Sequence, residues 1–327
     1  MVGRVNPTAN VAIGIVTFNR SRLLDGLLAS VAKMTVPPAR VIVVDNASSD
    51  KTREIIDRWA KRFGPDVLVS RRFDTNTGGS GGFSEVARVA VELGVDWVWL
   101  MDDDVEIVPD ALEQFAPWME RFEVIHGRRY DVDGTPFYWQ ARFNQFLGVP
   151  LPYSSRMLKS RGYAITDSGT FEGMLIATRI IRQIGTPDPR FFISWDDAIY
   201  AWLSAQVTKV VYVDAFVMRK KRRQKQANLG FRHMNESSAL VKYHVMRNRA
   251  HVGRYFQAHG KLNRVGFGLG TALTFVKEVF RLVVVEHSLS GFGALIRGWR
   301  DGRAIWADKA WQPMPPIPEG TDSQGDG

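Results

Sequence analysis

The 327-residue sequence contains no cysteine. Disulfide bonds, thiolate zinc sites and cysteine nucleophiles are therefore excluded. No stretch reaches the roughly 18 uninterrupted apolar residues that a membrane-spanning helix requires. The segment before the first apolar run is short and polar, unlike a secretory signal peptide. These absences predict a cytoplasmic protein.

Positive charge exceeds negative charge, with 43 Lys and Arg residues against 34 Asp and Glu residues and a net charge of +9. The excess is concentrated at 219–225 and recurs at Lys242, Arg247, Arg249 and Arg254. A nucleic acid, an anionic membrane or a phosphate-rich substrate would each explain it, as would a solvated loop without a partner. Aromatic residues do not alternate with the basic run, so we expect no nucleic-acid partner.

The first 110 residues alternate apolar runs with segments of helical periodicity. We expect strands at 11–17, 41–45, 67–71 and 97–101, and helices at 21–34, 49–63 and 82–93. Repeated units of this kind predict an α/β fold in which a mostly parallel sheet is flanked by helices. Ligands bind such sheets at the carboxyl ends of the strands.

The pattern changes in the second half of the chain. A hairpin turn at 131–135 and a strand at 210–213 are expected, followed by helices after residue 237. The last residues are rich in proline, glycine and acid, which is typical of disorder. We expect a catalytic domain at 1–235, with a donor half at 10–110 and an acceptor half at 111–235, a helical extension at 236–308 and a disordered tail at 309–327.

Three consecutive carboxylates, Asp102, Asp103 and Asp104, end the apolar run at 95–101. Clustered negative charge at the end of a buried strand needs a partner, and oxygen ligands suit Mg²⁺ or Mn²⁺. Capping of the helix that begins near Pro109, or simple solvation, would also explain the triplet. The segments 17–20 and 45–46 end neighbouring strands at the same edge, and this convergence favours a ligand site.

The segment 76–83 carries four glycines in five residues between a strand and a helix. Glycines permit a close backbone approach and leave N–H groups free for an anion. The segment matches neither the dinucleotide fingerprint nor the phosphate-loop motif, because its glycine spacing is different and it lacks the lysine of the phosphate loop. A flexible turn is an equally good interpretation.

A second carboxylate pair, Asp196 and Asp197, follows Trp195 and opens a helical pattern. The pair either caps the helix or supplies a general base, provided that its pKa is raised toward neutrality. Trp195 would offer a flat platform for a sugar ring. Together with a divalent ion at the triplet, these parts predict group transfer from a nucleotide diphosphate. A one-step displacement would invert the anomeric centre.

The motifs at 15–20, 43–50 and 102–104 resemble those of family-2, GT-A-fold inverting glycosyltransferases. Combined with 76–83 and 195–197, they resemble the actinobacterial galactofuranosyltransferases of cell-wall galactan (arabinogalactan) assembly. The length is similar to that of the initiating enzymes, which use UDP-galactofuranose and a polyprenyl-diphosphate-linked disaccharide. The resemblance covers residues 10–255 and includes a Tyr-x-x-x-Arg-Asn element at 243–248.

The resemblance implies a role for each matching residue. Asp197 becomes the base, while Trp195 and Asp196 contact the acceptor and Asp196 assists the base. Asp102 and Asp104 bind Mn²⁺ or Mg²⁺. The nucleotide-sugar residues are Thr17, Asn19, Arg20, Asp45, Asn76, Gly78, Gly79 and Asp103.

One departure from the family pattern concerns the metal. The family often supplies a histidine ligand at the end of the strand after the base, but the segment 214–219 contains none. His233 is our candidate for this ligand, and His244 is an alternative. A lone histidine is more often structural.

The implied acceptor lies in a bilayer, so the segment 262–300 could contact the membrane surface. Internal packing or an oligomer contact explains the same apolar pattern. We expect a peripheral protein on the inner face of the cell membrane, and the sequence does not define its oligomeric state.

The nearest rival function is a rhamnosyltransferase that uses dTDP-rhamnose on a lipid-linked acceptor. The glycine run ending in Phe83 and the triplet at 195–197 argue against it. A basic nucleic-acid-binding protein is the alternative from another class. A catalytically inactive sugar-nucleotide sensor is disfavoured because all expected carboxylates are present.

Overall fold

The computed structural model describes residues 10–318 except 138–139, 154–155, 223–225, 229–232 and 236–237. Its central sheet has the strand order β10-β12-β6-β11-β4-β1-β2-β3, with β5 paired to β12 and β7 paired to β6. The strands are β1 (Val11–Thr17), β2 (Arg40–Asp45), β3 (Leu68–Arg72), β4 (Trp97–Asp102), β5 (Val105–Ile107), β6 (Val124–Tyr130), β7 (Pro136–Phe137), β10 (Tyr163–Thr166), β11 (Met174–Ala177) and β12 (Val210–Lys220). Two hairpins lie outside it, β8 (Ala141–Asn144) with β9 (Val149–Pro152) and β13 (Gln226–Asn228) with β14 (His233–Asn235).

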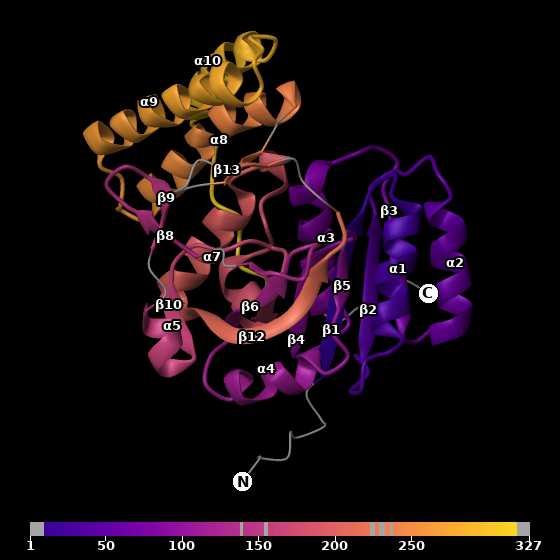
Figure 1. Cartoon of the computed structure of the whole chain (residues 1–327). Coiled ribbons are helices and arrows are strands. Elements are labelled where there is room, and N and C mark those ends of the chain that lie inside the picture. Colours follow the sequence, from indigo (N-terminus) through magenta and orange to yellow (C-terminus); the bar gives the residue numbers. More distant parts are fainter. Residues whose placement is uncertain are drawn as a thin grey trace.

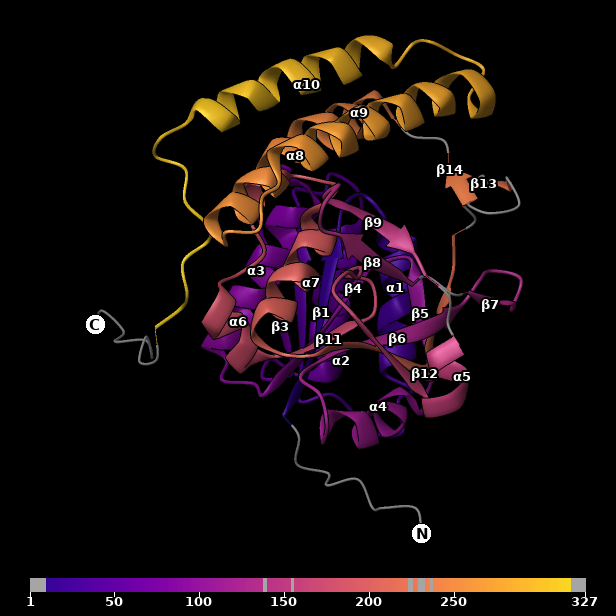
Figure 2. The same cartoon turned by 90° about the vertical axis from the view of Figure 1, so that its left-hand side faces the viewer.

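Helices cover both faces of the sheet and form a separate layer at one end of the molecule (Figure 1). They are α1 (Ser21–Val31), α2 (Thr52–Phe63), α3 (Gly78–Glu92), α4 (Ala111–Met119), α5 (Arg156–Arg161), α6 (Thr178–Ile184), the 3-10 turn η1 (Pro189–Phe191), α7 (Asp196–Val207), α8 (Ala239–Ala258), α9 (Arg264–Phe280), the π-helical segment η2 (Arg281–Val285) and α10 (Phe292–Ala307). Figure 2 shows α9 and α10 lying along the outside of that layer, with α8 beneath them.

The first half of the chain confirms the expected α/β architecture. Strand β1 pairs in parallel with β2 on one side and β4 on the other, and β2 pairs in parallel with β3. All seven residues of β1 are buried because helices cover both faces, which explains its continuous apolar sequence. The carboxyl ends of β1, β2 and β4 therefore meet at one edge, where the polar segments follow.

The helix expected from residue 82 begins earlier, at Gly78, so the glycine run forms its first turn. Gly82 is needed for packing, because a Cβ there would lie 2.4 Å from Cγ1 of Val16 on β1. Small residues in this turn bring the start of α3 against the end of β1. The glycine run is therefore an ordered part of the site edge and not a flexible turn.

Strand β12 is longer than the segment 210–213 predicted from sequence, and it ends at Lys220. Val217 and Met218 are buried, and Phe216 stacks on Tyr130 of the neighbouring strand β6. The first two residues of the basic run thus belong to the sheet. Residues 223–225 of that run lie outside the described residues.

The expected disordered tail is wrong for residues 309–318. Trp311 is only 8% exposed, and its indole N–H donates to Nδ1 of His251 at 3.1 Å. The backbone N–H of Ile317 donates to the carbonyl of Arg182 at 2.8 Å. Burial of the large Trp311 side chain fixes this segment despite its composition. Residues 319–327 lie outside the described residues.

Candidate active site

Asp103 turns back toward the end of β1. Its carboxylate accepts hydrogen bonds from the hydroxyl of Thr17 at 2.8 Å and from the guanidinium of Arg20 at 3.0 Å. Burial raises the pKa of Asp103 to about 6, although Arg20 opposes the shift. The structure therefore brings together three of the residues predicted to contact the nucleotide.

Asp45 and Asn19 hold the loop that follows β2. Asp45 accepts hydrogen bonds from Arg72 at 2.6 Å and from the backbone of Ser48 at 2.9 Å. Asn19, in a left-handed conformation with a φ of 53°, accepts from the backbone of Ser49 at 2.7 Å. These side chains give the loop a fixed shape at the same edge as Asp103.

The turn before α3 is fixed by two asparagines. Asn76 accepts a hydrogen bond from the N–H of Gly78 at 2.8 Å, and Asn46 donates to the Gly78 carbonyl at 2.8 Å. Gly78 has a φ of +74°, and a Cβ there would lie 2.0 Å from the carbonyl oxygen of Phe192. Asn76 thus orders the glycine turn, which touches the loop before α7.

Gly78→Ala should destabilise the fold by at least about 1–3 kcal/mol, since a left-handed backbone and a clash with Phe192 combine. Gly79→Ala is the matched control, because a Cβ at Gly79 meets nothing within 4 Å. Urea unfolding of both variants measures the difference. Equal losses in the two variants would contradict the proposed role of Gly78.

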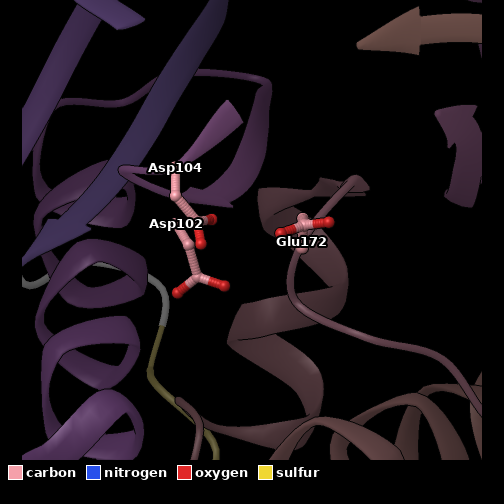
Figure 3. A group of neighbouring side chains, drawn as sticks. All are labelled: Asp102, Asp104 and Glu172. Atoms are coloured by element: carbon pink, nitrogen blue, oxygen red, sulfur yellow. The ribbon is translucent and has the colours of Figure 1, made fainter. Parts of the chain in front are cut away.

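Three carboxylates converge near the end of β4. Asp102, Asp104 and Glu172 offer oxygens that all lie within 4.8 Å of one another, and they are the group suited to a metal ion among the described residues. Figure 3 shows the two aspartates together and Glu172 facing them from another segment of the chain. An all-oxygen set of this kind fits a hard divalent ion such as Mg²⁺ or Mn²⁺. Glu172 was missed as a ligand because its segment carries no metal-binding motif.

Lys220 places an ammonium group directly on this carboxylate cluster. Its Nζ lies 2.6 Å from Asp104 and also forms an ion pair with Glu172, while the side chain is 6% exposed. Glu172 forms a further ion pair with Arg129. A divalent ion bound at these oxygens must therefore displace or share ligands with Lys220. From sequence, we expect the basic run that contains Lys220 either to face an anionic partner or to form a solvated loop, and neither expectation includes this contact with the carboxylates.

Of the two histidine candidates, His244 is not part of the carboxylate cluster found among the described residues. His233 lies on β14, and its side chain is outside the described part of the structure. His244 stacks on Phe192 with ring centroids 4.9 Å apart. Burial lowers the pKa of His244 to about 4, and the positive charge of Arg247 adds to the shift. Lys220 instead occupies the end of the strand after Asp197.

Lys220→Met should tighten Mn²⁺ binding to the nucleotide-free protein by at least about tenfold, because no ammonium then competes for Asp104 and Glu172. Unit charges 4 Å apart interact by roughly 4 kcal/mol near a protein surface, which makes such a change measurable. Titration calorimetry with MnCl₂ gives the affinity. Lys221→Met is the control, since Lys221 pairs with Glu106 at the surface. Equal or weaker binding by Lys220→Met than by the control would contradict this competition.

Asp196 and Asp197 form the first turn of α7 and line a cavity of about 580 Å³ together with Asp102 and Lys220. Asp196 accepts a hydrogen bond from Ser80 at 2.7 Å, which ties α7 to the glycine turn. Desolvation raises the pKa of Asp197 to about 8, and the neighbouring charge of Asp196 adds to the shift. The ionised form of Asp197 is therefore a stronger proton acceptor than an ordinary carboxylate, as a general base requires.

The loop before α7 has an unusual backbone. Phe192, Ser194 and Trp195 have φ values of 64°, 73° and 72°, in the left-handed region that such residues rarely adopt. The side-chain amide of Asn248 on α8 holds the loop by donating to the carbonyls of Phe191 at 2.8 Å, Ile193 at 2.9 Å and Ser194 at 3.0 Å. Strain of this kind persists only where the surroundings impose it, so the element at 243–248 positions the carboxylate pair.

Trp195 is placed differently from the predicted sugar platform. Its indole N–H donates to the carbonyl of Val245 at 2.9 Å, and the guanidinium carbon of Arg249 lies 5.2 Å from the ring centroid. Among the described residues that line the cavity, Ile193 and Ser194 take part but Trp195 does not. Trp195 packs against α8 in this structure.

The family to which the chain belongs follows from a match at residues 12–177 to the model for glycosyl transferase family 2. The protein is a member of that family. Galactofuranosyltransferase GlfT1 of Mycolicibacterium smegmatis is 38% identical over 206 residues, covering 58% of this chain and 63% of that protein. GlfT2 of Mycobacterium tuberculosis is 26% identical over 228 residues, covering 61% and 35%. The chain thus spans less than two thirds of the length of either relative.

Solved structures support the fold. TarS 1–349 from Staphylococcus aureus has a TM-score of 0.58 at 15% identity and covers 90% of this chain and 80% of its own. Mannosyltransferase PcManGT from Pyrobaculum calidifontis has a TM-score of 0.52 at 16% identity and covers 93% and 78%. Together with the sheet and its flanking helices, these similarities identify a GT-A fold with a C-terminal helical extension. The predicted fold and family are confirmed.

Proposed function

We propose that the protein transfers galactofuranose from UDP-galactofuranose to a polyprenyl-diphosphate-linked disaccharide, with inversion, in cell-wall galactan assembly. Its similarity to galactofuranosyltransferases supports galactofuranose as the sugar that is transferred. The observation that carries the proposal is the single cavity that Asp102, Glu172, Asp196 and Asp197 line together. A cation-binding carboxylate group and a candidate base then face the same reacting atoms.

The catalytic roles follow from this arrangement. Thr17, Arg20 and Asp103 form a hydrogen-bonded group at the nucleotide side, and Asp45 shapes the neighbouring loop. Asp102 and Asp104 would hold a divalent ion, such as the Mn²⁺ present with PcManGT, and that ion would supply positive charge for the diphosphate leaving group. Asp197 removes the proton of the acceptor hydroxyl as that oxygen attacks the anomeric carbon and the bond to the diphosphate breaks. Attack opposite the leaving group inverts that carbon.

The rate of transfer should rise with pH. Only the ionised carboxylate of Asp197 accepts a proton, and its pKa is raised to about 8. The active fraction therefore grows as pH rises through that value and falls below it. A profile of kcat/KM between pH 6 and 9 should increase through pH 8, where the base is half ionised, and level off only toward pH 9, with Asp196 and Asp197 titrating as a pair. A flat profile over this range would contradict Asp197 as the base.

We propose a peripheral position on the inner face of the cell membrane. No helix among the described residues is long and apolar enough to cross a bilayer. Twelve of the seventeen exposed large apolar side chains of the described residues fall within 265–306. On α9 they include Val265, Leu269, Leu273 and Phe280, which lie on one helical face. The basic residues of the same helix, Arg264 and Lys277, suit anionic lipid headgroups.

Thermal stabilisation by UDP and by dTDP distinguishes the proposed galactofuranosyltransferase from a rhamnosyltransferase. A galactofuranosyltransferase should be stabilised against heat by UDP, and a rhamnosyltransferase by dTDP. We expect a larger shift in Tm with UDP than with dTDP in the presence of MnCl₂. A larger shift with dTDP would favour the rhamnosyltransferase. Strong, salt-sensitive retention on DNA would instead favour a nucleic-acid-binding protein.

A further inference from the structure

An apolar groove separates helices α8, α9 and α10, and the mechanism above makes no use of it. Its volume is about 880 Å³, within the range of ligand-binding pockets. Aromatic side chains supply much of the lining, including Phe267, Phe275, Trp299 and Trp306. Trp299 is 50% exposed, so the groove opens onto the apolar outer face of these helices.

The charged side chains that line this groove are all positive. Four arginines line it, Arg249, Arg254, Arg264 and Arg303, and no Asp or Glu does so among the described lining residues. None of the four forms an ion pair within the described part of the chain. Arg254 donates to the carbonyl of Asp308 at 3.0 Å, and the guanidinium of Arg303 lies over Trp299. Cationic groups beside an apolar surface are the complement of an anion that carries a hydrocarbon chain.

Arg249 connects the groove to the catalytic loop. Its side chain is 2% exposed, and its guanidinium donates to the carbonyls of Leu147 and Gly148. The same guanidinium lies 5.2 Å from the ring of Trp195, the residue before Asp196. Arg249 therefore lines the groove and also contacts the ring of the residue that precedes the carboxylate pair.

We propose that this groove binds the isoprenoid chain of a polyprenyl diphosphate, and that the arginines at its edge contact the diphosphate. The identity of the lipid rests on the proposed function, whereas the chemistry of the groove does not. The apolar lining accommodates a hydrocarbon chain, and its opening toward Ile296 and Trp299 lets the chain enter from a bilayer surface. The glycan end of the same lipid then lies on the side of Trp195 and Asp197.

Binding to lipid nanodiscs tests this assignment with the full chain. One set contains a long-chain polyprenyl phosphate in phosphatidylcholine, and a second contains phosphatidylglycerol at equal charge. We expect at least about tenfold tighter binding to the polyprenyl set, because only the isoprenoid chain leaves the bilayer for the groove. Equal binding to both sets would overturn the proposal in favour of general attraction to anionic lipid.

Two groups of variants locate the binding site. Gly268→Leu fills the groove, and a Cβ at Gly268 meets nothing within 4 Å, so the helix should tolerate it. It should remove the preference for polyprenyl phosphate, whereas Gly293→Leu on α10, outside the groove, should keep it. The double variant Arg264→Gln with Arg303→Gln should weaken polyprenyl phosphate binding at least about tenfold without adding bulk. An unchanged preference in both groove variants would overturn the proposal.

Further measurements distinguish a failure of the groove assignment from a failure of the proposed catalytic function. UDP binding, and donor transfer to a short water-soluble acceptor glycoside, should be unchanged in Gly268→Leu. Lipid binding without any galactofuranosyl transfer by the wild-type protein would refute the proposed function and leave the groove assignment intact. A lipid-free dimer that Gly268→Leu dissociates, with polyprenyl binding unchanged, would assign the groove to a second copy of the chain and overturn the proposal.

Discussion

Asp197→Asn should lower the rate of transfer by roughly 10²–10⁴-fold, the range that a general base contributes. The amide cannot accept the proton of the acceptor hydroxyl, and burial raises the carboxylate pKa at both members of the Asp196–Asp197 pair that lines the cavity. UDP binding should remain nearly unchanged, because the nucleotide-side residues Thr17, Arg20 and Asp103 are not among the described residues that line the cavity with Asp197. Steady-state transfer rates and calorimetric titration with UDP measure the two quantities.

Asp196→Asn is the informative comparison for this variant. Its amide oxygen can still accept the hydrogen bond from Ser80, so the turn between α3 and α7 should stay in place. We expect a smaller loss of rate than for Asp197→Asn, through weaker positioning of the acceptor. If Asp196→Asn alone abolishes transfer and Asp197→Asn does not, the base is Asp196 and the assignment made above is wrong.

Asp102→Asn should reduce the rate of transfer by about three orders of magnitude. Charge stabilisation by a bound metal lowers the activation free energy by several kcal/mol, and each 1.36 kcal/mol changes the rate by a factor of ten. Asp102 lines the cavity, while Asp104 and Glu172 are engaged by Lys220. Asp102 is thus the carboxylate that an incoming divalent ion meets without breaking an ion pair seen among the described residues. The variant should also lose the dependence of UDP affinity on MnCl₂.

Asp96→Asn provides the control for Asp102→Asn. Asp96 is exposed near the opposite end of β4, where it accepts a hydrogen bond from the backbone of Asn10. Its replacement should leave both transfer and MnCl₂-dependent UDP binding unchanged. Full activity of Asp102→Asn, or of the wild-type protein in excess chelator, would remove the metal from the mechanism.

The donor half could be predicted from sequence because its physical signals are local. Strands β1, β2 and β4 are buried on both faces and therefore appear as continuous apolar runs. Their parallel pairing then brings Thr17, Asp45 and Asp102 to one edge without further information. The acidic triplet, the glycine run and the pair at 196–197 were found for the same reason.

The contacts between distant segments could not be predicted in this way. Lys220 reaches Asp104 because β12 pairs with the short strand β5, with Lys220 opposite Val105. The local sequence does not predict a pairing between strands that lie more than one hundred residues apart in the chain. The positions of Glu172 and Trp195 depend on the same kind of long-range packing. The motif at 243–248 was recognised, but its contact with the loop before α7 required the structure.

The most direct test of the proposed function is a transfer assay with the purified protein, MnCl₂ and a polyprenyl-diphosphate-linked disaccharide. Four donors are offered separately in this assay: UDP-galactofuranose, UDP-galactopyranose, UDP-glucose and dTDP-rhamnose. We expect a product from UDP-galactofuranose alone, with the configuration of the new linkage opposite to that of the donor. Transfer from dTDP-rhamnose in its place, or a product that retains the donor configuration, would contradict the proposed function.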